Sequence, residues 1–286
     1  RKWKKRETKR IKKVEKTMAY EVLVLDVDGT LMRTDKTISR KTIDEIVKIQ
    51  EKGICVAIAS GRCTAGIMPT ARKIRLDEFG GYIVSYNGAC ISNAKTGEVI
   101  YNINLPDGIV PEIYEFSKRE KTGIMTYHDN DIIAENDADQ YIQIDAKGCD
   151  IDIHVVEDFG KEVTYPVNKC LLTGDPDWMK DVEPKAAKAF EGRLSVYRSE
   201  DFYVEMMPLG IDKAYGLSKL LKKLGFSRNQ MICCGDGFND ISMIEYAGLG
   251  VAMANAAEEV RARANYVAPH CDEDGLVDVI HRFIND

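Results

Sequence analysis

The chain has 286 residues, of which 44% are hydrophobic and 30% are charged, and its net charge at neutral pH is −6. This length suits two domains, and the hydrophobic content excludes a globally disordered chain. No apolar run reaches the roughly 18 residues that a membrane-spanning helix needs, so we expect no membrane partner.

The charge is distributed unevenly along the chain. Residues 1–17 hold ten Lys/Arg and two Glu, whereas the remaining chain holds 30 basic and 44 acidic residues. An acidic body is a poor nucleic-acid surface, because affinity there comes mainly from neutralising phosphates. We therefore expect a cytoplasmic protein without a nucleic-acid partner. The basic leader 1–17 is interpreted as disordered or non-native, with Met18 as the natural start; a nucleic-acid arm or a targeting tail is the alternative.

The eight cysteines show no CxxC spacing, and several lie within apolar runs. This pattern predicts buried thiols in a reducing compartment rather than disulfides or a zinc site. The cysteines are residues 55, 63, 90, 149, 170, 233, 234 and 271.

In the first and last parts of the chain, short apolar runs alternate with helical patterns, which predicts parallel strands buried on both faces. One helix is expected from Ser39, its N-cap, to Lys52, and another from Ala214 to Leu224, where Gly225 ends it. The predicted strands are Val22–Leu25, Cys55–Ala59, Ile83–Ser85, Met231–Cys234 and Gly250–Ala252. This βαβ pattern predicts an α/β fold with a doubly wound, mainly parallel sheet.

The middle of the chain has shorter strand patterns with polar turns and fewer helices. Strands are expected at Gly123–Tyr127 and Asp131–Ala134, helices near Ile109–Arg119 and Trp178–Phe190, and a hairpin from Leu194–Arg198 and Phe202–Met206. We interpret residues 86–207 as an inserted α+β domain. The α/β core would then be discontinuous, comprising residues 18–85 and 208–286.

The motif Asp26-Val27-Asp28-Gly29-Thr30 directly follows the first predicted strand. Two carboxylates at i and i+2 suit chemistry in which one attacks phosphorus and the other handles protons. Gly29 permits close approach of the backbone, and the N–H groups of the turn can cradle phosphate oxygens. An ordinary acidic turn is the alternative.

Three further motifs follow along the chain, two directly after predicted strands and one at the start of a predicted helix. Ser60-Gly61-Arg62 offers a hydroxyl and an N–H to a phosphate oxygen, with a helix N-cap as the alternative. Lys213 opens a helix and can screen the charge between phosphate and a carboxylate, with a surface lysine as the alternative. The segment Gly235–Asp240 supplies hard carboxylate oxygens that suit Mg²⁺ and not zinc, and a dinucleotide fingerprint would require glycine where Asp240 stands.

The set of four motifs resembles the haloacid dehalogenase superfamily, and within it the Cof-type, sugar-phosphatase-like branch. The resemblance covers Met18 to the C-terminus and extends to Asn87-Gly88 and to residues 244–248. It implies a Rossmann-like core with an α+β cap inserted between the serine and lysine motifs. It also implies a Mg²⁺-dependent phosphatase that acts on a small phosphorylated metabolite, such as a sugar phosphate, through a phospho-aspartate.

The resemblance assigns roles by position. Asp26 would be the nucleophile and a metal ligand, and Asp28 the general acid/base whose backbone carbonyl also contacts the metal. Asp236 would ligate Mg²⁺, with Asn239 and Asp240 organising phosphate and metal beside it. The residues expected to bind the phosphoryl group are Asp26, Gly29, Thr30, Ser60, Gly61, Lys213 and Asn239.

Substrate choice is expected to reside in the cap, as is the case when a mobile domain closes over a phosphate site. The candidates for contact with the leaving group are Asn87, Tyr127, His128, Asp129 and Lys169, and exposed turn or sheet positions are the alternative. A phosphomutase and a non-catalytic sensor of phosphorylated metabolites are the rival functions. We expect a monomer or a homodimer.

Overall fold

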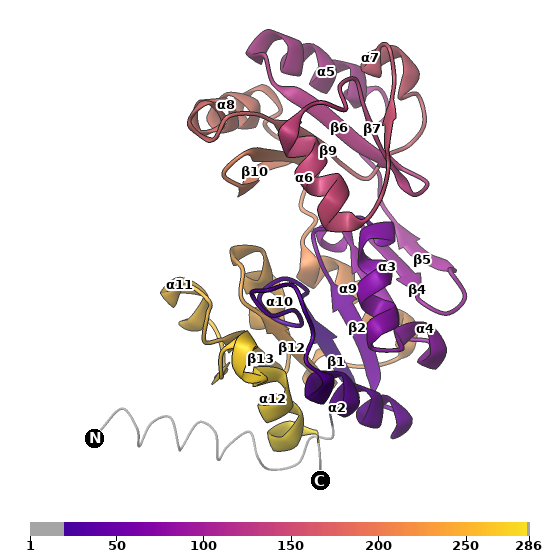
Figure 1. The fold of residues 1–286 in the computed structure, drawn as a ribbon, viewed down its shortest axis with the longest axis vertical. Coiled ribbons are helices and arrows are strands. Elements are labelled where there is room, and N and C mark those ends of the chain that lie inside the picture. The colour runs from indigo at the N-terminus through magenta and orange to yellow at the C-terminus, as the bar shows by residue number, and fades with distance from the viewer. Residues whose placement is uncertain (1–19, 285–286) are drawn as a thin grey trace.

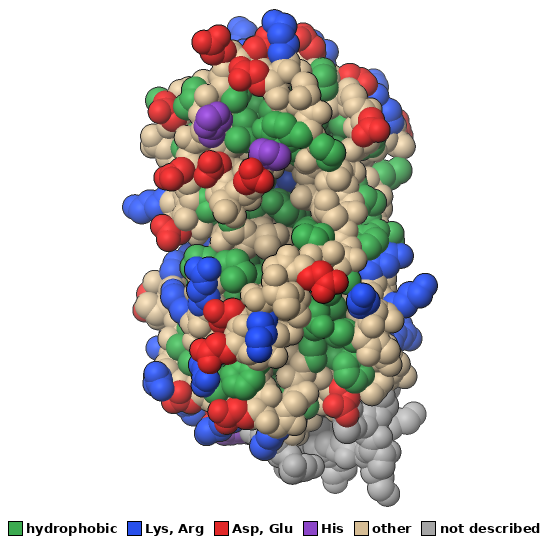
Figure 2. All heavy atoms as spheres, turned by 90° about the vertical axis from the view of Figure 1, so that its right-hand side faces the viewer, with side chains coloured by type: hydrophobic (Ala, Val, Ile, Leu, Met, Phe, Trp, Pro, Cys, Tyr) green, Lys and Arg blue, Asp and Glu red, His purple; other side chains and the backbone are tan. Residues whose placement is uncertain are grey.

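The computed structural model describes residues 20–284, so the predicted leader at 1–17 lies outside the described residues. The chain forms two sheets, one in each lobe of an elongated molecule (Figure 1). Within residues 20–284, no helix is long and apolar enough to cross a membrane. On the face shown in Figure 2, acidic and basic side chains are interspersed over both lobes.

The first sheet has eight strands in the order β14-β13-β12-β1-β2-β3-β4-β5. Neighbours from β14 to β3 pair in parallel, and β4 and β5 add an antiparallel edge. The strands are β1 (Val22–Leu25), β2 (Cys55–Ala59), β3 (Tyr82–Ser85), β4 (Cys90–Asn93), β5 (Val99–Asn102), β12 (Met231–Gly235), β13 (Leu249–Met253) and β14 (Tyr266–Ala268). The predicted α/β fold with a mainly parallel sheet is confirmed.

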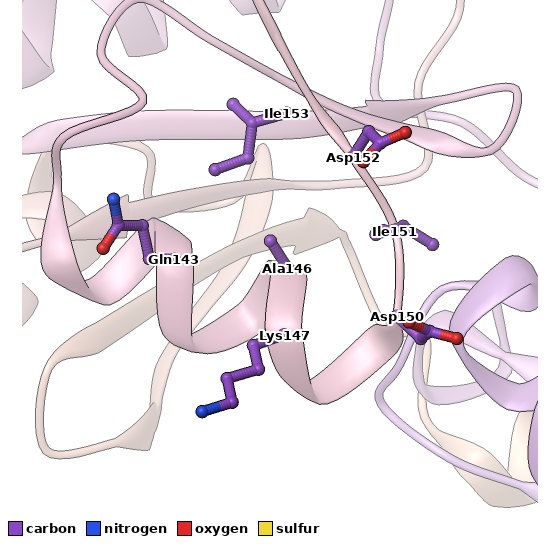
Figure 3. Close-up of a pocket in the computed structure, with 7 residues that line it drawn as sticks. All are labelled: Gln143, Ala146, Lys147, Asp150, Ile151, Asp152 and Ile153. Carbon is purple, nitrogen blue, oxygen red and sulfur yellow. The ribbon is translucent and has the colours of Figure 1, made fainter.

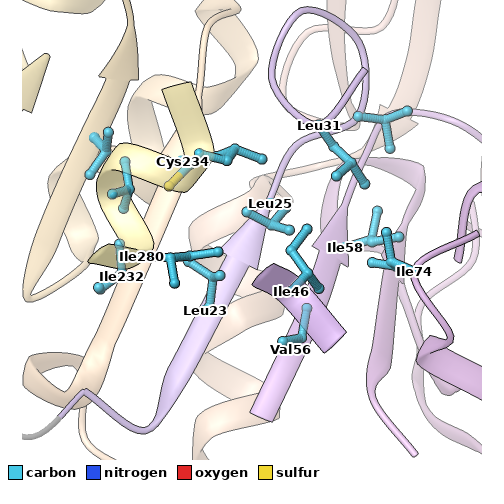
Figure 4. Close-up of a cluster of buried hydrophobic side chains, with 14 of the residues drawn as sticks. Leu23, Leu25, Leu31, Ile46, Val56, Ile58, Ile74, Ile232, Cys234 and Ile280 are labelled. Carbon is cyan, nitrogen blue, oxygen red and sulfur yellow. The ribbon is translucent and has the colours of Figure 1, made fainter. Parts of the chain in front are cut away.

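Side chains of the central strands alternate between two apolar layers, one on each face of the sheet. Leu23 and Leu25 pack in a cluster with α2 (Arg40–Glu51), α3 (Thr64–Lys73) and α12 (Gly275–Phe283), part of which is drawn in Figure 4. Val22 and Val24 pack on the opposite face, with helices α9 (Lys213–Leu224) and α10 (Ile241–Tyr246). The short helices α4 (Leu76–Phe79) and α11 (Glu258–Arg261) complete this lobe. The sheet is therefore doubly wound.

The predicted helix ends are also observed. The Ser39 hydroxyl accepts a hydrogen bond from the Thr42 N–H at 3.0 Å, as an N-cap should. Gly225 ends α9 with a positive φ of 78°, which glycine adopts without strain. All eight cysteines are free thiols, and only Cys55 is not fully buried.

The second sheet has six strands in the order β10-β11-β9-β6-β7-β8, antiparallel except for the pair β7–β8. Its strands are β6 (Gly123–His128), β7 (Asp131–Ala134), β8 (Ile153–Val155), β9 (Cys170–Thr173), β10 (Leu194–Glu200) and β11 (Tyr203–Pro208). Helices α5 (Ile109–Glu120), α7 (Phe159–Glu162) and α8 (Pro176–Ala189) pack in one apolar cluster with this sheet. A second cluster includes α6 (Gln140–Cys149) together with Cys63 and Tyr86 from the first lobe.

The strands β4 and β5 lie within residues 86–207, which the sequence assigned to the insertion, yet β4 pairs with β3 of the first sheet. We therefore propose that the core continues through β5 and that the cap begins between Asn102 and Ile109. An apolar run predicts that a strand forms but does not predict which sheet a hairpin joins. The proposed return to the core near Pro208 coincides with the end of β11.

Candidate active site

The predicted motifs meet at one edge of the first sheet because parallel strands present their carboxyl ends on the same side. Asp26 follows β1, Ser60 follows β2 and Asp236 follows β12, and β1 pairs directly with both β2 and β12. Lys213 is the first residue of α9, which packs on the face of this sheet. Residues separated by up to about 200 positions in the chain are thus brought to one place.

The centre of the site is a buried ammonium between carboxylates. Lys213 Nζ lies 2.7 Å from Asp26 Oδ1 and 2.5 Å from Asp240 Oδ1, and the lysine has no exposed surface. Asp26, Asp236 and Asp240 each offer a carboxylate oxygen, and these three oxygens lie within 4.8 Å of one another. Oxygen-rich sites of this kind match the ligand preference of Mg²⁺.

The cluster is short of positive charge, because three carboxylates gather around a single ammonium group. Burial raises the pKa of Asp26 to about 8, with a further rise from Asp240 that Lys213 opposes. Burial also raises the pKa of Asp236 to about 6. Burial alone would lower the pKa of Lys213, but the Asp240 and Asp26 carboxylates raise it above its ordinary value. A divalent cation among these oxygens would compensate the charge that Lys213 leaves unbalanced, so the residues present fit Mg²⁺.

Asp236 is oriented by groups from two other loops. It accepts hydrogen bonds from Thr30 Oγ1 at 2.9 Å and from Asn255 Nδ2 at 3.1 Å. Asn255 Nδ2 also donates to the Gly29 carbonyl at 2.8 Å. Sequence reasoning missed Asn255. A signal for it was present in the sequence, since this amide comes two residues after β13, at the same edge of the sheet.

Asp240 organises the loop after β12 as well as contacting Lys213. Its Oδ2 accepts from the N–H groups of Asp236 at 2.9 Å and Gly237 at 2.8 Å. The carboxylate is fully buried and therefore needs hydrogen-bond partners for both oxygens. An ammonium group and two backbone N–H groups supply them. Asp240 therefore fixes the position of the Asp236 backbone relative to Lys213.

The Asp28 carboxylate points to a different set of partners. It receives a bidentate pair from Arg62, with Nε–Oδ2 at 2.9 Å and Nη2–Oδ1 at 2.8 Å, and Lys36 Nζ lies 2.8 Å from Oδ1. Burial alone would raise the pKa of Asp28, but Arg62 and Lys36 hold it below its ordinary value. The Asp28 side chain is thus charged and is not one of the three clustered carboxylates. Any metal contact of Asp28 rests on its backbone carbonyl.

A chain of polar contacts links the first lobe to the second beside Ser60. Ser60 is buried, and its carbonyl accepts from the Asn87 N–H at 3.0 Å. Asn239 Nδ2 donates to Asn87 Oδ1 at 3.1 Å, and Asn87 Nδ2 donates to Tyr197 Oη of β10 at 2.8 Å. Asn87 is therefore a bridge between the loop after β12 and the cap, and Tyr197 is a further residue that sequence reasoning missed.

The four other cap candidates occupy two different environments. Tyr127 is buried, donates to Asp145 Oδ2 at 2.8 Å and packs near Tyr86, while Lys169 is buried against the loop after β2. His128 is the last residue of β6 and stacks on Tyr165, and Asp129 lies in the exposed turn that follows it. The contacts found within residues 20–284 join Tyr127 and Lys169, but not His128 or Asp129, to the first lobe.

One cavity of about 600 Å³ lies in the cap between α6 and the segment that leads into β8 (Figure 3). The residues that line it are Gln143, Ala146, Lys147, Asp150, Ile151, Asp152 and Ile153. None of the predicted site residues is among them. The carboxylate cluster and this cavity are therefore separate features.

A doubly wound α/β core with a buried carboxylate–lysine site at the strand ends, and with an α+β domain inserted between its motifs, defines a Rossmann-like enzyme with a cap domain. The family model of the haloacid dehalogenase-like hydrolases matches residues 23–280, and the chain belongs to this family. The resemblance that the four motifs indicated is thereby confirmed.

Individual relatives agree with this membership over nearly their full length. A haloacid dehalogenase-like hydrolase from Bacteroides thetaiotaomicron is 43% identical, with a TM-score of 0.88 over 92% of this chain and 99% of its own. A second solved structure, of a phosphatase of the same superfamily and organism, is 26% identical, with a TM-score of 0.77 over 93% and 95% of the two chains. The Bacillus subtilis 5-amino-6-(5-phospho-D-ribitylamino)uracil phosphatase YitU is 27% identical over 92% of this chain and 97% of its own.

Proposed function

We propose that this protein, a phosphatase of the haloacid dehalogenase-like family, uses Mg²⁺ and a phospho-aspartate on Asp26 to dephosphorylate a small sugar phosphate. The observation that carries the proposal is the buried cluster of Lys213 with the carboxylates of Asp26, Asp236 and Asp240. Binding a phosphate group alone does not require so many carboxylates beside it. Their arrangement suits a metal-assisted displacement at phosphorus.

The metal would be held by carboxylate oxygens of Asp26 and Asp236 and by the backbone carbonyl of Asp28. When bound, Mg²⁺ neutralises charge on the transferring phosphoryl group, which is the main source of stabilisation in such reactions. Lys213 adds a second positive charge next to Asp26. The phosphoryl oxygens would be held by Ser60 and Asn239. The turn after β1, with Gly29 and Thr30, and Gly61 after β2 would also hold them.

The reaction has two steps in which the chain's own groups carry the protons. The Asp26 carboxylate attacks phosphorus, the bond from phosphorus to the leaving oxygen breaks, and Asp28 protonates that oxygen. A water molecule then attacks the aspartyl phosphate while Asp28 takes a proton from it, which releases inorganic phosphate and restores Asp26. Despite burial, Arg62 and Lys36 lower the pKa of Asp28 in the substrate-free protein, so Asp28 must take up a proton before the first step, and the proton that it takes from water in the second step restores this protonated form.

Two observations support the proposed substrate class: the name of one relative and the polar seam between the lobes. The name of YitU describes a phosphorylated ribityl compound as the substrate of that relative, which is a small polyhydroxylated molecule. In this chain, the amide of Asn87 contacts both the amide of Asn239 and the hydroxyl of Tyr197 at the seam. Such groups can exchange their mutual hydrogen bonds for the hydroxyls of a sugar.

The proposal is tested by phosphate release from a panel of phosphorylated metabolites with Mg²⁺ or with EDTA. Release that requires Mg²⁺ is the expected result. Formation of an isomer rather than free phosphate, when a bisphosphorylated sugar is supplied, would instead favour the mutase. Intact Mg²⁺ binding without turnover on any substrate would favour the sensor.

Replacing Gly29 by alanine is expected to weaken Mg²⁺ binding about 10- to 100-fold. Gly29 has a positive φ of 77°, and a Cβ there would lie 2.2 Å from Asp236 Oδ2, so the carboxylate must move. Gly53→Ala is the matched control, because Gly53 also has a positive φ but its Cβ would meet nothing within 4 Å. Calorimetric titration with Mg²⁺ measures both variants, and equal affinities in the two would contradict the assignment of Asp236.

Mg²⁺ affinity is expected to rise about 10- to 100-fold between pH 6 and pH 8. The raised pKa values of Asp26, about 8, and Asp236, about 6, mean that the metal-free site holds protons that Mg²⁺ must displace. Because both folded-state pKa values lie above the ordinary value, the contribution of these two groups to the stability of the metal-free protein falls as the pH rises from about 4 towards 8. The increase in Tm caused by Mg²⁺ should therefore be larger at pH 8 than at pH 6, and a pH-independent increase would count against this metal site.

A further inference from the structure

The loop Ser60-Gly61-Arg62 is contacted by the cap on two sides. Lys169, which directly precedes β9 of the cap, donates from Nζ to the Gly61 carbonyl at 3.1 Å. In the opposite direction, Arg62 Nη1 donates to the Gly148 carbonyl near the end of α6 at 2.5 Å. Both contacts cross from one lobe to the other, so they exist only while the cap is seated on this loop.

Lys169 also forms a buried ion pair within the cap. Its Nζ lies 3.0 Å from Glu205 Oε2 on β11, and the side chains of Lys169 and Glu205 are 3% and 5% exposed. The Tyr127 ring lies against the ammonium, with its centroid 5.4 Å from Nζ. The lysine head group is thus surrounded by a carboxylate, an aromatic face and the Gly61 carbonyl. This environment suits a residue that fixes the loop. It leaves no free face of the ammonium group for contact with a leaving group.

The contacted loop carries two residues of the proposed reaction machinery. Ser60, on one side of Gly61, is proposed to hold a phosphoryl oxygen, and Arg62, on the other side, orients both oxygens of Asp28. The hydrogen bond from Lys169 to the Gly61 carbonyl therefore restricts the movement of Ser60 and Arg62 at once. Packing is tight along the same seam, because a Cβ on Gly66 of α3 would lie 2.6 Å from Cys149 Sγ of α6.

We propose that Lys169 is a positioning residue that, with the cap seated, fixes the Ser60–Arg62 loop and thereby couples cap closure to the chemical step. The inference rests on the proposed phosphatase function and replaces the earlier expectation that Lys169 contacts the leaving group. A leaving-group contact would affect each substrate differently. A loop-positioning contact affects the step that all substrates share.

The decisive experiment measures kcat and KM of Lys169→Met with three substrates that differ in their leaving groups: acetyl phosphate, p-nitrophenyl phosphate and ribose 5-phosphate. Methionine retains the apolar stem of lysine and removes the donor to Gly61. We expect kcat to fall about 10- to 100-fold on every substrate that the wild type hydrolyses, which is typical for a displacement of catalytic groups on the order of 1 Å. KM should change by less than about threefold, since the phosphate contacts remain.

Glu205→Gln is the matched control, because it breaks the same ion pair but leaves Lys169 able to donate to Gly61. It should lower Tm as Lys169→Met does, yet keep kcat within about threefold of the wild type. The double variant Lys169→Met/Glu205→Gln removes the unpaired buried carboxylate, so its Tm should recover relative to Lys169→Met while its kcat stays low. If Lys169→Met folds poorly, the kcat of the double variant still tests the proposal.

Three outcomes would overturn the proposal. Equal losses of kcat in Lys169→Met and Glu205→Gln would assign the ion pair a structural role only. Recovery of kcat together with Tm in the double variant would lead to the same conclusion. A loss confined to ribose 5-phosphate, with a raised KM, would make Lys169 a substrate contact. Failure of the proposed function is recognised separately, because the wild-type protein would then release no Mg²⁺-dependent phosphate from any of the three substrates.

Discussion

Asp26→Asn is expected to reduce turnover by at least about 10⁴-fold while the protein keeps its fold. Asparagine has nearly the same shape as aspartate, but its amide is a poor nucleophile and a weaker metal ligand. The reaction proposed above therefore loses the group that forms the bond to phosphorus. Phosphate release in the presence of Mg²⁺, measured with wild type and variant side by side, gives the ratio directly.

The same variant should be more stable than the wild type when no metal is present. Burial and the neighbouring Asp240 carboxylate raise the pKa of Asp26, so the charged Asp26 is unfavourable there, and Lys213 retains Asp240 as its partner. Asp44→Asn is the control for an Asp-to-Asn change as such, because the ion pair of Asp44 with Arg40 is exposed and lies on α2. Turnover of Asp26→Asn equal to that of Asp44→Asn would remove the nucleophile assignment.

Lys213→Met is expected to cost about 3–5 kcal/mol of folding free energy without metal and about 10³-fold in kcat. Lys213 is fully buried, and its removal leaves the carboxylates of Asp26 and Asp240 without their counter-charge. Chemical denaturation with EDTA measures the first effect, and phosphate release with Mg²⁺ measures the second. Added Mg²⁺ should restore part of the stability, because it places positive charge among the same oxygens.

The double variant Lys213→Met/Asp240→Asn separates the two roles of the lysine. Removing the Asp240 charge relieves the repulsion, so stability should recover in part. The kcat should remain low, because the positive charge next to Asp26 is still missing. If the double variant recovered both stability and turnover, Lys213 would have a structural role and no direct part in the reaction.

Local features of the fold were predictable from the sequence because they depend on near neighbours in the chain. The five strands predicted for the core form, the helix that starts after Ser39 and the helix that ends before Gly225 form, and the cysteines are free thiols. Apolar periodicity and end-capping residues report the local conformation directly. The elements that were missed, such as α6, β8 and β9, are short or have mixed patterns that several conformations can satisfy.

The candidate site was predictable as a set of strand-end motifs, and the roles of its residues stay predictions until variants are measured. The sequence could place Asp26, Ser60 and Asp236 at one edge because carboxyl ends of parallel strands share an edge. It could not show that Asn255 orients Asp236 or that Arg62 holds both oxygens of Asp28. Those contacts depend on how separate loops turn after their strands leave the sheet.

The sequence by itself determined the chemistry that is available, namely an α/β core whose strand ends carry paired carboxylates, a serine and a lysine. Tertiary structure decided which groups meet. It placed β12 beside β1, assigned β4 and β5 to the core sheet and seated Lys169 of the cap on Gly61. The physical reason is that residue patterns encode local geometry and burial, whereas contacts between distant segments depend on strand order and on the packing of one lobe against the other.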